Sequence, residues 1–167
     1  KQMKFINIIG GAECNFIPSK AEIEVDSTVY YFAEHITYNI DQETSHLTEN
    51  AKVVSGLTEL NAGKISANWG TNTLVADSYN DISPMVMTAT NTIPMYGSSM
   101  IFNLATNQGK ILDGYTKLDM GIFSGRENQE IFQESNESVH IKHGIFTSCN
   151  AENPHYYFYS DYMKSIP

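Results

Sequence analysis

The sequence is poor in basic residues. Ten Lys and Arg stand against nineteen Asp and Glu in 167 residues, which gives a formal net charge of −9. Nucleic acids and anionic membrane surfaces are bound largely through Lys and Arg. We therefore expect no nucleic-acid partner, and an anionic membrane surface is an equally poor one.

Long apolar runs are also missing. No stretch approaches the roughly 20 apolar residues that a membrane-spanning helix needs. The apolar segment 4–11 is interrupted by Asn7 and is shorter than the core of a signal peptide. If the protein is exported, we expect its signal to have been removed from this chain already.

Only two cysteines are present, Cys14 and Cys149, and no Cys-x-x-Cys pair occurs. This spacing excludes a zinc ribbon and a thioredoxin-type redox site. A single long-range disulfide and two free thiols both remain open on the sequence alone.

Catalytic motifs are absent too. There is no Gly-x-Ser-x-Gly, no phosphate-binding loop and no His-Glu-x-x-His. His140 and His143 are three residues apart, so on a strand they point to opposite faces. They are therefore poorly placed to bind one metal ion together. The carboxylates at 22, 24 and 26 share one strand face without an acid–base partner. We therefore expect that the protein is not an enzyme and that it binds no metal and no cofactor.

What the chain does have is strand-forming residues. Hydrophobic residues make up 41% and aromatic residues 11%, mostly Tyr and Phe, which favour pleated, half-buried surfaces. Short apolar-alternating runs, each ended by Asn, Asp, Gly, Ser or Thr, predict an all-β domain. We expect a loop over 80–94 and an exposed polar segment over 125–138. Strands are predicted over 21–26, 29–40, 45–54, 60–69, 74–76, 99–104, 110–116, 118–123 and, in two parts joined at Cys149, 139–160.

An internal repeat underlies these strands. Asn39, Asn68 and Asn103 each stand beside a large apolar residue and are followed by a polar turn and an apolar return strand. The spacings, 29 and 35 residues, predict stacked hairpins. Such hairpins bury one apolar face each, so stacking must supply the burial. The interior could be a filled core, as in most β-sandwiches, or an open trough for an apolar ligand.

The residues of two hairpins resemble the OstA/LptA-like family. The segments 61–76 and 101–111 match its strand–turn–strand unit, and the second carries the pattern Phe-Asn-Leu-x-Thr-x-x-Gly-x-Ile. The segment Gly-Ile-Phe-Thr-Ser-Cys over 144–149, with Pro154 beyond it, is similar to an element of LptD, the outer-membrane family of lipopolysaccharide assembly, in its Bacteroidetes form. Phe146 and Ser148 replace the commoner Tyr and Thr. The resemblance covers roughly residues 21 to 167.

The resemblance implies an open β-jellyroll, a V-shaped stack of antiparallel strands in the periplasm, preceded by a segment 1–20 that contains Cys14. In that family an apolar trough carries the acyl chains of lipopolysaccharide to a C-terminal barrel in the outer membrane, which is missing from this chain. We expect the lipid-facing residues to be Ile36, Tyr38, Ile40, Ile65, Trp69, Met100, Phe102, Leu104, Ile141 and Phe158.

The resemblance also implies partners. These are the lipid A acyl chains, an LptA-like bridge protein joined by edge-strand addition, the barrel and an LptE-like lipoprotein. Cys14 and Cys149 match the family's two cysteines, which usually pair with cysteines of the barrel. Two alternatives remain open: a soluble LptA-like bridge protein, and a closed β-sandwich or solenoid that binds glycans or acts as an adhesin.

Overall fold

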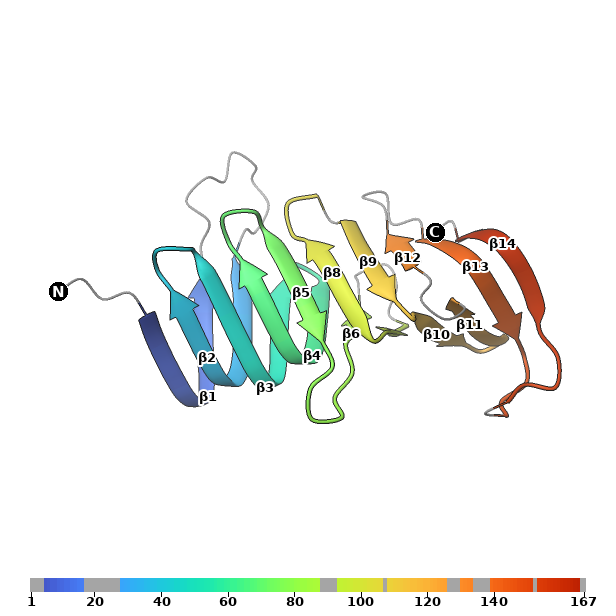
Figure 1. Ribbon diagram of the computed structural model, residues 1–167, viewed down its shortest axis with the longest axis horizontal. Coiled ribbons are helices and arrows are strands. Elements are labelled where there is room, and N and C mark those ends of the chain that lie inside the picture. Colours follow the sequence, from blue (N-terminus) through green and yellow to red (C-terminus); the bar gives the residue numbers. More distant parts are fainter. Residues whose placement is uncertain are drawn as a thin grey trace.

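The computed structural model describes residues 5–16, 28–87, 93–106, 108–125, 130–133, 139–151 and 153–165. All regular elements in these ranges are strands, as the composition predicts (Figure 1). In chain order they are β1 (Phe5–Phe16), β2 (Val29–Asn39), β3 (Thr44–Ser55), β4 (Thr58–Asn68), β5 (Thr73–Asp77), β6 (Met85–Met87), β7 (Met95–Tyr96), β8 (Ser99–Asn103), β9 (Gln108–Leu112), β10 (Tyr115–Leu118), β11 (Gly121–Gly125), β12 (Glu130–Gln133), β13 (Val139–Thr147) and β14 (Phe158–Ser165).

The strands form one antiparallel sheet that divides and rejoins. One edge of β4 pairs with β3, while its other edge pairs with β6 through 59–61 and with β5 through 64–68. One branch continues through β8, β9 and β12, and the other through β7, β10 and β11. The branches meet again on β13, which pairs with β12 through 139–141 and with β11 through 144–147. The sheet is therefore folded into two walls.

The long strands belong to both walls because each bends in the middle. The first wall contains β5, β8, β9 and β12, and the second contains β6, β7, β10 and β11 (Figure 1). The strands β2, β3 and β4 contribute 35–39, 44–48 and 64–68 to the first wall, and 29–32, 51–55 and 58–61 to the second. We call the line where the chain passes between the walls the corner.

Unusual backbone conformations mark the corner. Glu49, Asn50, Asp113 and His143 have φ values of 65°, 54°, 50° and 50°, and Gly10 has a φ of 91°. The pairing register shifts at the same places in β1, β2 and β3. A left-handed residue interrupts the pleat and turns the strand, so these residues fold the sheet.

Two glycines let other chain segments approach the corner closely. A Cβ at Gly63 would lie 2.2 Å from the carbonyl oxygen of Tyr79, and one at Gly97 would lie 2.4 Å from Cγ2 of Ile111. The Gly63 N–H also donates to the carbonyl of Ile82 at 3.2 Å. Glycine is required at Gly63 because its close neighbour is backbone.

The asparagine repeat is confirmed, and its role is to close the turns at the rim of the first wall. The Oδ1 of Asn39 accepts from the N–H groups of Asp41 and Gln42, and that of Asn68 accepts from Thr71 at 3.0 Å. The Oδ1 of Asn103 accepts from Ala105 and Thr106, both at 3.0 Å. Such side-chain bonds replace the backbone partners that a strand loses where it ends.

The space between the walls is packed. One continuous cluster contains inward side chains of both walls, each at most 7% exposed. Leu47 and Ile65 of the first wall have 0% exposure, and Val53 of the second has 2%. Of the two outcomes left open by the strand pattern, the middle of the molecule thus shows the filled interior. The sheet around it does not close into a barrel.

Several elements differ from expectation. Residues 5–16, for which no strand was predicted, form the first strand of the sheet and pair with β2. Short strand β6 occurs within 80–94, which was expected to be a loop, and β12 within 125–138, which was expected to be polar and exposed. In both cases neighbouring strands supply the hydrogen bonds. The strand expected at 21–26, with its three carboxylates, lies outside the described residues.

Candidate apolar binding site

One residue of each strand in the first wall falls in a single line across the sheet. The register pairs Ile36 with Leu47, Leu47 with Ile65, and so on to the last strand without a break. Every position is apolar, and Ile8 of β1 and Ile131 of β12 occupy the corresponding register positions. We call this line the first row. It comprises Ile8, Ile36, Leu47, Ile65, Ala76, Met100, Ile111, Ile131, Ile141 and Met163.

The second wall carries a matching line. It begins at the register position of Cys14 and contains one polar residue between β2 and β14, Thr116, whose hydroxyl donates to the carbonyl of Pro94 at 3.1 Å. At a strand spacing of about 4.8 Å, either line runs roughly 40 Å. We call it the second row. It comprises Cys14, Tyr31, Val53, Leu60, Val86, Met95, Thr116, Phe123, Phe146 and Phe158.

Most of the residues expected to face lipid lie between the walls. Six of them are buried, and Tyr38 and Leu104 are partly buried against the same cluster. The buried ones are Ile36, Ile65, Trp69, Met100, Phe102 and Ile141.

Two of the expected residues lie elsewhere. Ile40 is in the turn after β2 and is 41% exposed, because the alternation of that strand ends at Asn39. Phe158 belongs to the second row but is 65% exposed, since it stands on β14, the last strand of the sheet.

Sequence alternation missed part of the second row. Simple alternation from Ile141 would continue to Ile145, but β13 bends at His143, and the residue in the second row is Phe146. Val53, Leu60 and Val86 were not singled out either. The bend that changes the alternation leaves only a weak signal in the sequence, a polar residue or a glycine within an apolar strand.

A hollow lies between the walls near the centre of the molecule. Its volume is about 270 Å³, the solvent at its mouth included. Leu60 and Val86 line it from the second wall, and Met100, Phe102 and Ile111 from the first. Gly109, opposite Phe102 in the register, leaves the wall without a side chain there. Ile101 and Lys110 of the first wall complete the lining, which is apolar except for Lys110.

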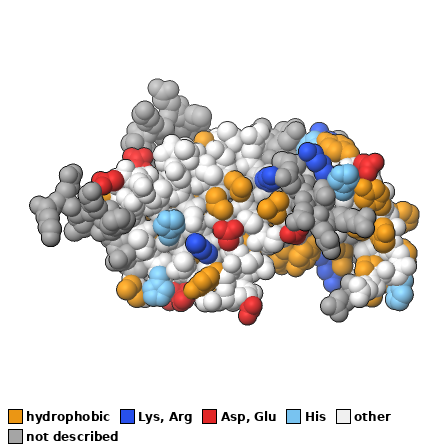
Figure 2. Space-filling model, in the orientation of Figure 1, with side chains coloured by type: hydrophobic (Ala, Val, Ile, Leu, Met, Phe, Trp, Pro, Cys, Tyr) orange, Lys and Arg blue, Asp and Glu red, His pale blue; other side chains and the backbone are white. Residues whose placement is uncertain are grey.

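The second row ends in an open stack of aromatic rings. The ring centroids of Phe123 and Phe146 are 4.5 Å apart, and those of Phe146 and Phe158 are 6.3 Å apart. Exposure increases along the stack, from partly buried Phe123 to Phe158 on the last strand. On the face seen in Figure 2, hydrophobic side chains gather over these C-terminal strands. The apolar interior is therefore accessible at this end.

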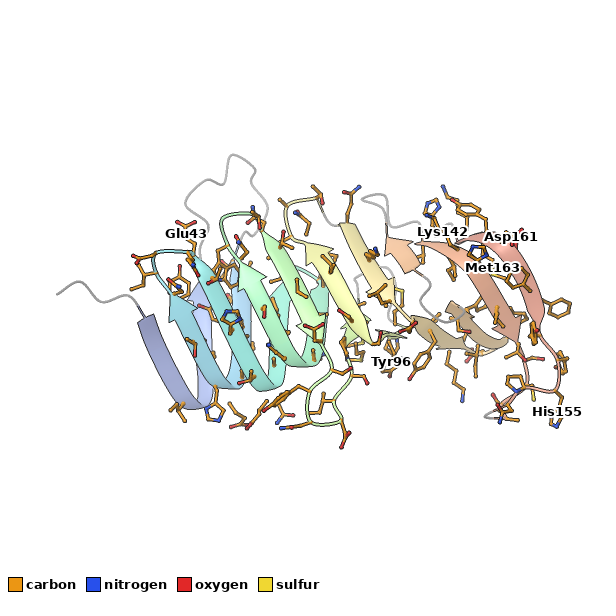
Figure 3. All side chains as sticks on the ribbon, viewed as in Figure 1. Glu43, Tyr96, Lys142, His155, Asp161 and Met163 are labelled. Atoms are coloured by element: carbon orange, nitrogen blue, oxygen red, sulfur yellow. The ribbon has the colours of Figure 1, made fainter. Side chains whose placement is uncertain are left out.

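The loop after β13 holds Cys149 as a free thiol. Its Sγ lies 3.3 Å from Nδ1 of His155, which Figure 3 shows at the loop between β13 and β14. Hydrogen bonds from the backbone of His155 and Ala151, and then from the His155 ring, lower the pKa of this thiol to about 7. Cys14 lies on β1, at the other end of the sheet (Figure 1). A disulfide between the two, one of the readings left open by the sequence, does not form.

The two neighbouring histidines bond tyrosines of β14. His140 contacts the hydroxyl of Tyr162, and Nδ1 of His143 lies 2.7 Å from the hydroxyl of Tyr159. That hydroxyl donates to Asp161 at 2.8 Å. In the ranges the structure describes, no group of three or more His, Cys, Asp or Glu could hold a metal ion, and no helix is long and apolar enough to cross a membrane.

The folded, unclosed antiparallel sheet with an apolar interior defines the chain as a β-jellyroll of the LptA type. A similar solved structure is that of LptH, described as the LptA-homologous periplasmic component of the lipopolysaccharide transport device from Pseudomonas aeruginosa. The TM-score is 0.53 at 11% identity, covering 85% of this chain and 96% of that one. No family model and no curated protein matches the sequence. The likeness is therefore one of fold.

Proposed function

We propose that this protein carries the acyl chains of lipopolysaccharide between its two walls, in the periplasm, without chemistry of its own. The observation that supports this proposal is the first row, an apolar line without a polar side chain among its described members, facing the second row. The structural likeness to LptH points the same way.

The energetics suit transport. Each CH₂ of an acyl chain left in water forgoes roughly 0.8 kcal/mol of favourable burial. Neighbouring positions along the rows are chemically alike, so a chain can move from one to the next without losing hydrogen bonds. The net charge of −9 disfavours tight contact with an anionic headgroup, so the acyl chains supply most of the affinity.

Two positions along the proposed transport route are compatible with this chain. Its fold matches nearly the whole length of LptH, which favours a bridge component. The Gly144–Cys149 element, with its free and partly exposed thiol in the loop, favours the periplasmic domain of an LptD-like protein whose cysteine pairs with a barrel. The gene sequence downstream of the Pro167 codon distinguishes the two. A long segment that encodes a barrel would favour the LptD-like protein.

Photo-crosslinking tests the transport function. A crosslinker at Phe102, inward and 6% exposed, should capture lipopolysaccharide, while one at the adjacent Ile101, outward and 44% exposed, should not. Phe102→Glu should reduce capture from a crosslinker at Ile111 at least tenfold, because a charge would be buried in the first wall. Ile101→Glu is the matched control.

Circular dichroism would show whether each variant still folds. Equal capture at Phe102 and Ile101 in folded protein would contradict the proposed route between the walls.

A further inference from the structure

Trp69 connects the two walls. It stands in the turn after β4, at the rim of the first wall, and is 5% exposed. Its indole N–H donates to the hydroxyl of Ser45, on the first wall, at 2.6 Å. Its ring lies 5.3 Å, centroid to centroid, from that of Tyr31, on the second wall. One side chain therefore bonds one wall and packs on the other.

The surroundings of Trp69 make this contact hard to replace. Ser45 has 0% exposure, and Tyr31 is 7% exposed. A buried hydroxyl that loses its partner is left without water, and that loss is costly. Parting the walls here would also expose the indole and the Tyr31 ring, which carry much apolar surface.

An acyl chain cannot pass Trp69 in the observed arrangement. The interior beside it is filled: Leu47 and Ile65 of the first row are fully buried, and Ala67, next to Trp69 in the first wall, is 2% exposed. The hollow in the described interior lies beyond β4, between Leu60, Val86 and the strands β8 and β9. Entry into the section built by β2, β3 and β4 thus requires the indole to move.

We propose that Trp69, held by Ser45, is a latch that joins the two walls at the rim of the first wall. An acyl chain that occupies the section built by β2, β3 and β4 displaces it. This inference rests on the proposed function. The indole leaves Ser45 and Tyr31 and turns towards solvent as the walls part. Loss of the Ser45 hydroxyl weakens the closed form and should speed loading.

Trp69 is the single tryptophan of the chain, so its fluorescence reports on the latch without labelling. Lipid A and a long-chain fatty acid serve as probes, added to the whole protein in stopped flow. We expect the emission of the wild type to shift to longer wavelength on binding. Ser45→Ala should load about threefold to tenfold faster, the effect of one hydrogen bond.

Ser66→Ala is the matched control. Ser66 lies on the same wall, and its hydroxyl meets His46 on the outer side, so the variant should load like the wild type. Trp69→Phe, which keeps a ring but loses the N–H, should also load faster, as measured by equilibrium dialysis at short times.

The outcomes separate the two proposals. Binding with unchanged emission, or a Ser45→Ala rate equal to that of Ser66→Ala, would overturn the latch while the transport function stands. If folded wild-type protein binds neither lipid A nor the fatty acid, the transport function fails, and the latch fails with it.

Discussion

At the residue scale, the asparagines could be read from the sequence and the glycines could not. Asn39, Asn68 and Asn103 recur before polar turns, and the structure gives each the same task of accepting backbone N–H groups. Gly63 shows no motif around it. Its role depends on Tyr79, which reaches it through a separate loop, so no local pattern could reveal it.

The close approach at Gly63 gives a stability prediction. Gly63→Ala should lower the free energy of unfolding by more than about 2 kcal/mol, because the added Cβ would lie 2.2 Å from a backbone oxygen. Gly70→Ala is the control, since its Cβ would meet only side-chain atoms, the flexible Glu43 carboxylate at 3.2 Å and Oδ1 of Asn68 at 3.5 Å. Urea unfolding of both variants measures the difference, and equal midpoints would contradict the close packing.

The Cys149 loop gives a pH prediction. A pKa lowered to about 7 means that the thiolate fraction rises as the pH passes through 7, two units below the ordinary value of 9.0. Alkylation by iodoacetamide, in a Cys14→Ser background, should reach half its maximal rate near pH 7. His155→Ala should move that midpoint upward. A midpoint that stays near 9 in the parent would show that the loop does not hold the thiolate.

At the scale of the element, alternation predicts a strand but not its bend. The period of two correctly places Ile36 with Tyr38, Ile65 with Ala67, and Met100 with Phe102. It fails on β13, where the bend at His143 exchanges the faces and brings Phe146 rather than Ile145 into the second row. The left-handed residues at the bends, among them Glu49, Asn50 and His143, belong to no sequence motif, so the walls could not be derived from strand patterns.

The bend of β3 can be tested at Asn50. Its φ of 54° is tolerated by Asn and Gly but is strained for β-branched residues. Asn50→Val should destabilise the protein by about 1–2 kcal/mol, whereas Asn50→Gly should change it by less than about 1 kcal/mol. Thermal unfolding of the pair measures this, and a Val variant as stable as the Gly variant would mean that the strand is not bent there.

At the scale of the whole molecule, both end strands have an edge that pairs with no described strand. Beyond β14 the rows end at Met163 and Phe158, and at the other end β1 pairs only with β2. Such edges add strands from other chains. The expected edge-strand addition of an LptA-like bridge protein requires such an edge and stays a prediction.

Met163 tests whether the rows must continue into that partner. Figure 3 shows it on β14 near Lys142 and Asp161. If an LptA-like protein adds its strand to β14, Met163→Lys would place a charge where the first row meets that strand and should weaken the association about tenfold. Tyr162→Lys puts the same charge on the outer face and should cost much less. Crosslinking between the two proteins measures both, and equal losses would rule out a continuous row.

The register of the rows also restricts how the molecule can change in length. Each strand supplies one residue to each row where it crosses it, so a single inserted residue would turn a strand's apolar side chain outward and interrupt the line. Adding or removing two successive bent strands, each spanning both walls with its corner, leaves the cross-section unchanged. Proteins of this design can therefore become longer by duplicating whole units, while the cross-section of their apolar interior stays the same.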